Sequence, residues 1–150
     1  MPGTVVGIAS ERDLLVLQGD APAAELLALL AERRVPGKQL HVFDGRTTVV
    51  ISRENLHDEG MLRDALHSRL GGRAHLVDGL AALSAIGAGI NATYDNVLAG
   101  SAALAGIGVE TVGMATSSFR ITWLVPDPRV QDAVRALHER YIEQQRPPVP

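Results

Sequence analysis

The sequence contains no cysteine and few aromatic residues, and these absences exclude whole classes of protein. Without cysteine there are no disulfides, no thiolate nucleophiles and no Cys-ligated zinc sites. Aromatic side chains make up 3% of the chain, so aliphatic side chains must fill the core and no platform exists for stacking nucleic-acid bases. The net charge of −3 likewise leaves no basic footprint for nucleic acid.

Long apolar runs are also missing. No apolar stretch reaches about 18 residues, the length that a transmembrane helix needs, and no signal peptide is expected. Together with the lack of cysteine, this predicts a cytoplasmic protein without a membrane partner. The length of 150 residues and the hydrophobic fraction of 46% suffice for one domain or two small ones. Residues 144–150 are predicted to be a disordered tail.

Apolar periodicity predicts two halves with the same order of strands and helices. The first half has strands at 4–9 and 13–18, a helix over 21–34, a hairpin of 39–43 and 46–52, a helix over 57–70 and a strand at 73–78. The second half has a strand at 80–87, a helix over 93–107, strands at 109–115 and 119–125 and a helix over 128–143. This order predicts an α+β fold of two ferredoxin-like βαββαβ modules, with antiparallel sheets and both helices of a module on one face.

The stretch Gly87-Ala88-Gly89-Ile90-Asn91-Ala92 matches the G-x-G-x-x-A pattern of a dinucleotide-binding turn, and Glu110 follows at the distance of a ribose-binding acid. A dinucleotide fold needs successive parallel β-α-β units. Here the strand after Glu110 turns at Ser117-Ser118 into another strand, which makes a hairpin. We therefore interpret Gly87 and Gly89 as a tight strand-to-helix turn, with a ligand cradle as the alternative.

Three motifs carry a resemblance to a known family. They are Gly87-Ala88-Gly89 after a strand, the run from Met114 to Thr122 at the hairpin, and Ala133 to Glu139 in the last helix. The chain resembles the regulatory region of aspartate kinases, a pair of ACT domains, without the kinase catalytic domain. The resemblance implies modules at 10–79 and 80–143, with strand 4–9 added to the second sheet and the two modules interlocked.

The same resemblance implies a non-catalytic, stand-alone feedback sensor that binds an amino acid such as lysine or threonine and shifts the activity of an enzyme. The implied partners are a second copy of the chain, in a homodimer, and an aspartate kinase or another biosynthetic enzyme. In the family, a strand-to-helix loop and a neighbouring strand hold the ligand. The corresponding residues are Asp20, Ala21, Pro22, Ala23, Gln39 and His41, with Thr116, Ser117 and Ser118 from the partner module.

Several of these residues have simpler interpretations. Asp20 also suits the cap of the following helix, His41 an exposed strand position, and Thr116-Ser117-Ser118 a hairpin turn. The segment from Asn91 through Tyr94, Asp95 and Asn96 is either a second ligand site or a helix cap. No histidine spacing indicates a metal, and no cofactor is expected.

Two other functions stay open at this point. One is a small-molecule enzyme recruited from this scaffold, with Asp20, His41 or Tyr94 as the acid–base group. The other is a ligand-free assembly module.

Overall fold

A computed structural model describes residues 3–144 of the chain. The strands and helices, in chain order, are β1 (Gly7–Gly19), α1 (Ala23–Glu32), β2 (Gln39–Phe43), β3 (Arg46–Ser52), α2 (Glu59–Leu70), β4 (Ala74–Ile86), α3 (Asp95–Gly106), β5 (Gly113–Thr116), β6 (Arg120–Pro126) and α4 (Val130–His138). Short helical turns cover Arg53–Asn55, Gly71–Arg73 and Asp127–Arg129, and a π-helical turn, Glu139–Glu143, extends α4. The predicted tail falls, beyond Gln144, outside the described residues.

The chain divides into two compact units. One, the contiguous unit, is Asp13–Leu80; the other, the split unit, joins the residues up to Arg12 to those from Ala81 onward. The long strands β1 and β4 each have one part in the contiguous unit and the other part in the split unit. The hydrogen-bonded order of the strands is β2-β3-β1-β4-β6-β5.

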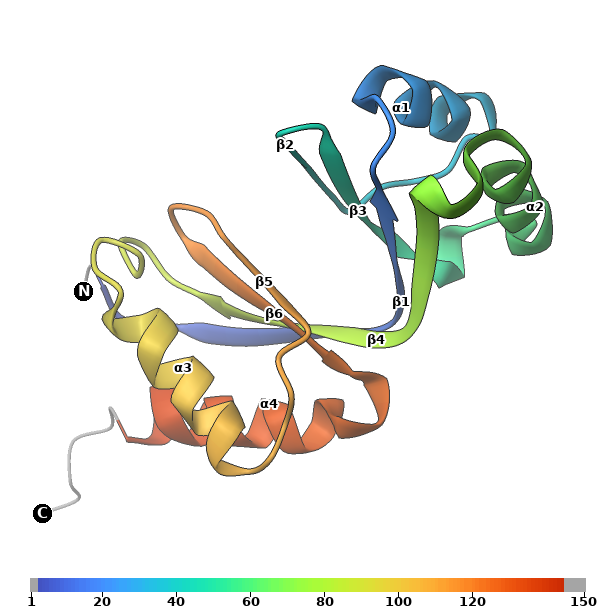
Figure 1. Cartoon of the computed structure of the whole chain (residues 1–150). Helices are drawn as coiled ribbons and strands as arrows, with labels where there is room; N and C mark the ends of the chain where they lie inside the picture. Colours follow the sequence, from blue (N-terminus) through green and yellow to red (C-terminus); the bar gives the residue numbers. More distant parts are fainter. Residues whose placement is uncertain (1–2, 145–150) are drawn as a thin grey trace, which may run out of the picture. The chain divides into compact units, whose positions relative to one another are not determined.

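The contiguous unit has strand order β2-β3-β1-β4, and α1 and α2 cover one face of these strands (Figure 1). The predicted hairpin is confirmed to the residue, because Asp44 and Gly45 adopt positive φ angles of 48° and 75° that suit a two-residue hairpin turn. Alternate residues of β1 and β3 face the helices. The core consists mainly of Leu15, Leu17, Leu26, Leu29, Val49, Ile51, Leu62, Leu66 and Leu70.

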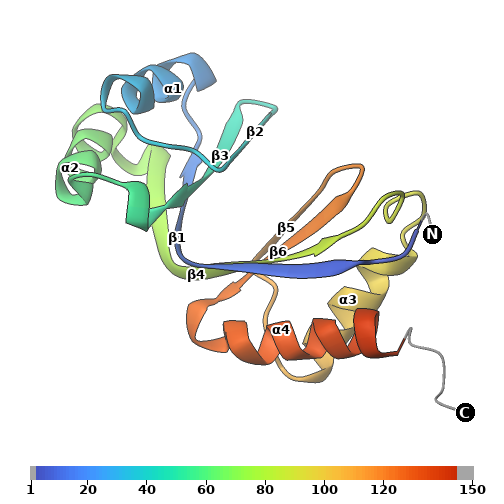
Figure 2. The ribbon, with the colours of Figure 1, turned by 180° about the vertical axis from the view of Figure 1, so that it is seen from behind.

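The split unit has strand order β1-β4-β6-β5, with α3 and α4 together on one face (Figure 2). The predicted inward face of β6 is confirmed at Ile121, Trp123 and Val125, which are fully buried. Phe119, predicted to share that face, lies just before β6 and is exposed. Gly100 of α3 lets this helix approach closely, because a Cβ there would lie 2.5 Å from Trp123 Cζ2.

Two predicted strand breaks are wrong. The sequence predicts separate strands on either side of Glu11-Arg12, and again on either side of Gly79, but β1 and β4 run through both places. Asp13 (φ 57°) and Gly79 (φ 71°) turn the backbone locally without ending the strand. Polar residues and glycine commonly end strands, whereas here they lie within two long strands.

The helices end close to their predicted bounds, but two predicted caps are wrong. Pro22 occupies the N-cap position of α1 and no side chain caps it, so Asp20 is not a helix cap. Tyr94 occupies the N-cap position of α3, again without a side-chain cap. The ring of Pro22 fixes its φ at a value that suits the start of a helix, so α1 can begin here without a capping side chain. No helix within residues 3–144 is long and apolar enough to cross a membrane.

Candidate functional site

The loop between β1 and α1 contains three of the predicted ligand residues, Asp20, Ala21 and Pro22, and the fourth, Ala23, is the first residue of α1. Asp20 is exposed, and its backbone N–H donates to the carbonyl oxygen of Arg73 at 2.6 Å, which ties the loop to the start of β4. Ala21 is buried, and Pro22 accepts from the N–H groups of Glu25 and Leu26 at 3.0 and 3.2 Å. Since no side chain caps α1, the loop presents a helix N-terminus suited to a carboxylate.

Gln39 and His41 lie on β2, the last strand at one edge of the sheet order. His41 pairs with Thr48, which pairs with Gln18, so three polar side chains form a row across β2, β3 and β1. Gln18 Oε1 lies 3.1 Å from His75 Nε2, which extends the row to β4. The row faces away from α1 and α2, because the neighbouring Leu17 packs in the helix-covered core.

Thr47 is a residue that the sequence analysis missed. It pairs with Gly19, directly before the Asp20 loop, and its side chain is 1% exposed. Its hydroxyl oxygen is buried without a hydrogen-bond partner, which is unusual for a buried polar group. A threonine within a strand is ordinary in sequence, so only the three-dimensional structure reveals this hydroxyl.

Gly87 and Gly89 form a structural turn at the end of β4 in the split unit. The N–H of Gly87 donates to the Phe119 carbonyl at 2.9 Å, and a Cβ at Gly87 would collide with the Thr4 carbonyl oxygen. Gly89 has a φ of 70°, in the left-handed region that favours glycine. The backbone of neighbouring segments therefore occupies the space around Gly87.

Asn91 and Asn96 fasten this turn to its surroundings. The Asn91 side-chain amide donates to the carbonyl oxygens of Ser117 and Arg120, the latter at 3.0 Å. The Asn96 amide donates to Gly3 and Ile90 at 3.0 and 3.1 Å. The expected helix cap is replaced by these loop contacts, and Thr93 Oγ1 accepts from the N–H of Asp95. Asn91 Oδ1 is buried and unpartnered.

The remaining candidates of the split unit are exposed. Thr116 ends β5, and Ser117 and Ser118 form the turn that leads to β6. The turn is closed by the backbone bond from Ser117 N–H to the Arg120 carbonyl at 2.9 Å. Tyr94 is 82% exposed. The three hydroxyls and the Tyr94 ring are therefore accessible to a ligand or a partner.

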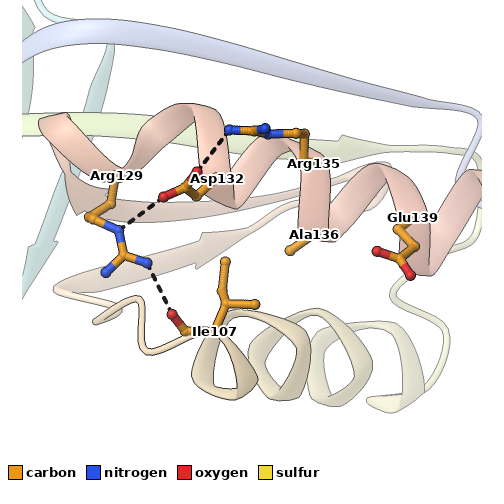
Figure 3. A pocket seen from close by; sticks show the side chains of 6 residues that line it. All are labelled: Ile107, Arg129, Asp132, Arg135, Ala136 and Glu139. Atoms are coloured by element: carbon orange, nitrogen blue, oxygen red, sulfur yellow. Dashed lines mark hydrogen bonds and ion pairs between the residues drawn. The ribbon is translucent and has the colours of Figure 1, made fainter.

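One surface hollow is lined by a predicted residue, and a second is not. Gln39 lines a groove of about 370 Å³ in the contiguous unit, whose other lining side chains come mostly from α1 and β2–β3 and are mainly apolar, Leu27, Leu30, Val35 and Leu40 among them. A hollow of about 260 Å³ between α3 and α4 (Figure 3) contains none of the predicted residues. Within this hollow, Asp132 pairs with Arg129 at 3.4 Å and with Arg135 at 2.8 Å.

Within residues 3–144, no three His, Asp or Glu side chains gather closely enough to hold an ion. Ion pairs surround Arg53, with Glu59 at 2.7 Å and Asp13 at 3.1 Å. The hydrogen bonds of Arg53 lower the pKa of Glu59, and those of Arg69 lower the pKa of Glu32.

The architecture is similar to that of known structures, although no protein-family model and no curated protein sequence matches the chain. The regulatory subunit of aspartate kinase from Thermus thermophilus, in its ligand-free form, superposes with a TM-score of 0.77 at 23% identity. The alignment covers 92% of this chain and 98% of that subunit.

Complete aspartate kinases contain the same fold as one part of a longer chain. The enzyme from Clostridium acetobutylicum matches with a TM-score of 0.82 at 15% identity, over 93% of this chain and 35% of that one. Aspartokinase III of E. coli, in complex with lysine and aspartate, matches with a TM-score of 0.71 at 17% identity, over 94% and 34%. This chain has the fold of the regulatory subunits of aspartate kinases.

Proposed function

We propose that this protein is a non-catalytic regulatory subunit that binds an amino acid through two ferredoxin-like ACT modules. One observation carries the proposal: a chain of similar length, the Thermus thermophilus regulatory subunit, has the same fold from end to end. A binding protein of this kind acts by stabilising one conformation of its partner, and the coupling between ligand and partner is reciprocal.

The order of strands supports the two-module description. In the contiguous unit, β1-α1-β2-β3-α2-β4 follows the ferredoxin-like βαββαβ order. In the split unit, β4-α3-β5-β6-α4 supplies five of the six elements of this βαββαβ order. The N-terminal part of β1, which lies beside β4, takes the place of the sixth element, the last strand. Modules over 10–79 and 80–143, interlocked by the N-terminal strand, fit this arrangement.

The β1–α1 loop suits the two charged groups of an amino acid. The uncapped N-terminus of α1 would accept the α-carboxylate, and the exposed Asp20 carboxylate would hold the ammonium. The unpartnered Thr47 hydroxyl lies at the base of this loop. We assign Gln39 and His41 to the ligand side chain. Thr116, Ser117 and Ser118 are a second set of candidate ligand groups.

A nuclear magnetic resonance titration of the uniformly ¹⁵N-labelled chain tests the site. Lysine, threonine and methionine are added separately, and we expect one of them to shift the amide signals of residues 19–25 and of β2. Glycine amide, which lacks the carboxylate, serves as the control and should leave these signals in place. Shifts confined to other segments, or none with any amino acid, would reject this site.

We also propose that β2 pairs with β2 of a second copy in a homodimer. The strand ends the sheet order and exposes Leu40, Val42 and Phe43, and β2 itself contains no lysine, glutamate or proline. Sedimentation of Val42→Lys should then show monomers. The control Met61→Lys, at an exposed apolar residue of α2, should sediment as the wild type does. Monomeric wild-type protein would contradict the proposal.

The regulated enzyme would be an aspartate kinase or another enzyme of amino-acid synthesis. The fold occurs within complete aspartate kinases, where it makes up about a third of the chain. Adding this protein to an aspartate kinase catalytic chain should make the kinase rate respond to the amino acid. A rate unaffected by the protein, with and without the amino acid, would exclude that partner.

A further inference from the structure

A buried serine interrupts the apolar part of β4 that belongs to the split unit. Ser84 is the one polar residue between Leu80 and Ile86, and it is only 4% exposed. A buried hydroxyl needs hydrogen-bond partners, and Ser84 has two of them. Its Oγ lies 2.9 Å from Thr122 Oγ1 and accepts from Arg120 Nη1 at 3.1 Å. The serine thus connects β4 to two side chains of β6.

The two partners lie on the face of the sheet opposite α3 and α4. Ile121 and Trp123 of β6 are buried in the core beneath these helices (Figure 2). Because successive side chains of a strand point to opposite faces, Arg120 and Thr122 point away from the helices. Arg120 is exposed and Thr122 is partly exposed. The guanidinium therefore reaches solvent while one of its nitrogens is fixed to the buried Ser84.

Arg120 is a cation without an anionic partner in the part of the chain that the structure describes. No carboxylate of residues 3–144 forms an ion pair with it, and its side chain donates to a neutral hydroxyl instead. By contrast, Arg63 and Arg69 each pair with a glutamate. A guanidinium stays protonated and presents a fork of N–H donors, most of which Ser84 leaves unused. The chain thus leaves a full positive charge with donors to spare.

The backbone of Arg120 is also held in place. Its carbonyl oxygen accepts from the N–H of Ser117 at 2.9 Å and from the Asn91 side-chain amide at 3.0 Å. Ser84 holds the other end of the residue, at the guanidinium. Since both ends are fixed before any ligand arrives, less conformational entropy is lost when an anion binds.

We propose that Arg120, positioned by Ser84, binds an oxyanion, the carboxylate or phosphate group of a small molecule, on this face of the split unit. The planar guanidinium can donate to two oxygens of such a group at once. Ser84 is a positioning residue, because it acts through Arg120. A single exposed guanidinium binds weakly, so we expect a dissociation constant of about 1 mM. The inference does not require that the protein binds an amino acid, because the anion needs no ammonium group.

A nuclear magnetic resonance titration of the ¹⁵N-labelled full chain tests the site with two probes, inorganic phosphate and malonate. Sodium chloride at the same ionic strength reports the effect of screening alone. We expect the Arg120 Nε–H signal and the amide signals of Ser84 and Thr122 to shift saturably with phosphate, malonate or both, and the probe that binds identifies the group. Equal shifts with chloride, or no shift with either probe, would overturn the proposal.

Arg120→Gln should weaken binding about tenfold or more, because the hydrogen bonds to a charged donor are lost. The matched control is Arg140→Gln, which removes the same charge from the same unit. Arg140 also donates to a neutral side chain, that of Gln144 at 3.4 Å, but it has no contact with Ser84. The control should bind the probe as the wild type does. Wild-type affinity in Arg120→Gln would show that the anion binds elsewhere.

Two further variants cover the case in which Arg120→Gln does not fold. Arg120→Lys keeps the charge without the fork, so the affinity should fall several-fold. Ser84→Ala keeps Arg120 and removes its anchor, which should also lower the affinity several-fold while the free energy of unfolding shows that the variant is folded. An unchanged affinity in Arg120→Lys would exclude binding through the guanidinium fork, and one in Ser84→Ala would exclude positioning by Ser84.

Discussion

Gly87 is held where a side chain has no room. The Thr4 carbonyl oxygen and the Ile90 side chain occupy the position of a Cβ, and the Gly87 N–H is bonded to Phe119. Gly87→Ala should lower the free energy of unfolding by about 1–3 kcal/mol, as overpacking does. In the control Gly60→Ala, on α2, nothing lies within 4 Å of the new Cβ, and stability should be kept or raised. Urea unfolding curves give the free energy of unfolding of both variants. Equal values would show that the turn at Gly87 tolerates a side chain.

Tyr141 links the stability of the split unit to pH. Burial raises the pKa of Tyr141 to about 12, and its hydroxyl donates to the Asn96 carbonyl. Between the unfolded pKa of about 10 and this value, only the unfolded chain loses the proton, so the free energy of unfolding should fall by about 2–3 kcal/mol as pH rises. Tyr141→Phe should remove this fall, whereas Tyr94→Phe, at an exposed ring, should keep it. The free energy of unfolding is measured from pH 9 to pH 12. If it falls equally steeply with pH in both variants, this account is contradicted.

In the contiguous unit, α1 begins without a side-chain cap, whereas α2 begins with one. At α2, Asp58 Oδ1 accepts from the N–H of Met61 at 3.3 Å, and Asp58 itself has a φ of 56°. Asp58→Ala should cost about 1 kcal/mol for the lost cap and more for the left-handed backbone. Asp58→Asn should cost less, because asparagine caps helices and tolerates this φ. Thermal unfolding in which the two variants are equally destabilised would argue against a capping role.

Local signals predicted some strands and helices well and others poorly. Asp44-Gly45 fixes the hairpin to the residue, and the apolar spacing of Leu62, Leu66 and Leu70 gives α2 its inner face. The continuity of β1 and β4 depends on pairing with strands distant in sequence, so Glu11-Arg12 and Gly79 gave false breaks. The same limit applies to the site. The roles of Asn91 and Asn96 depend on carbonyl oxygens up to 93 residues away, and the orphaned Thr47 hydroxyl has no local signal.

For the molecule as a whole, the order of strands and helices was predictable because the second half of the chain repeats the order of the first. Each half has its own aliphatic core, and these cores lie in the contiguous and split units. The motifs around Gly87, Thr116 and Ala133 led to the regulatory fold that the solved structures share. The order of strands and helices does not specify a ligand; under the proposed function, ligand identity depends on a few side chains around the Asp20 loop.

Isothermal titration calorimetry of the full chain with lysine, threonine, methionine and related amino acids tests the central claim most directly. The account predicts saturable heat with at least one of them. The heat should be lost in Asp20→Asn and kept in Asp64→Asn, which changes the same charge at an exposed position of α2. Heat that survives Asp20→Asn would move the site away from the β1–α1 loop. A folded protein that gives no heat with any amino acid would contradict the claim that this protein is an amino-acid sensor.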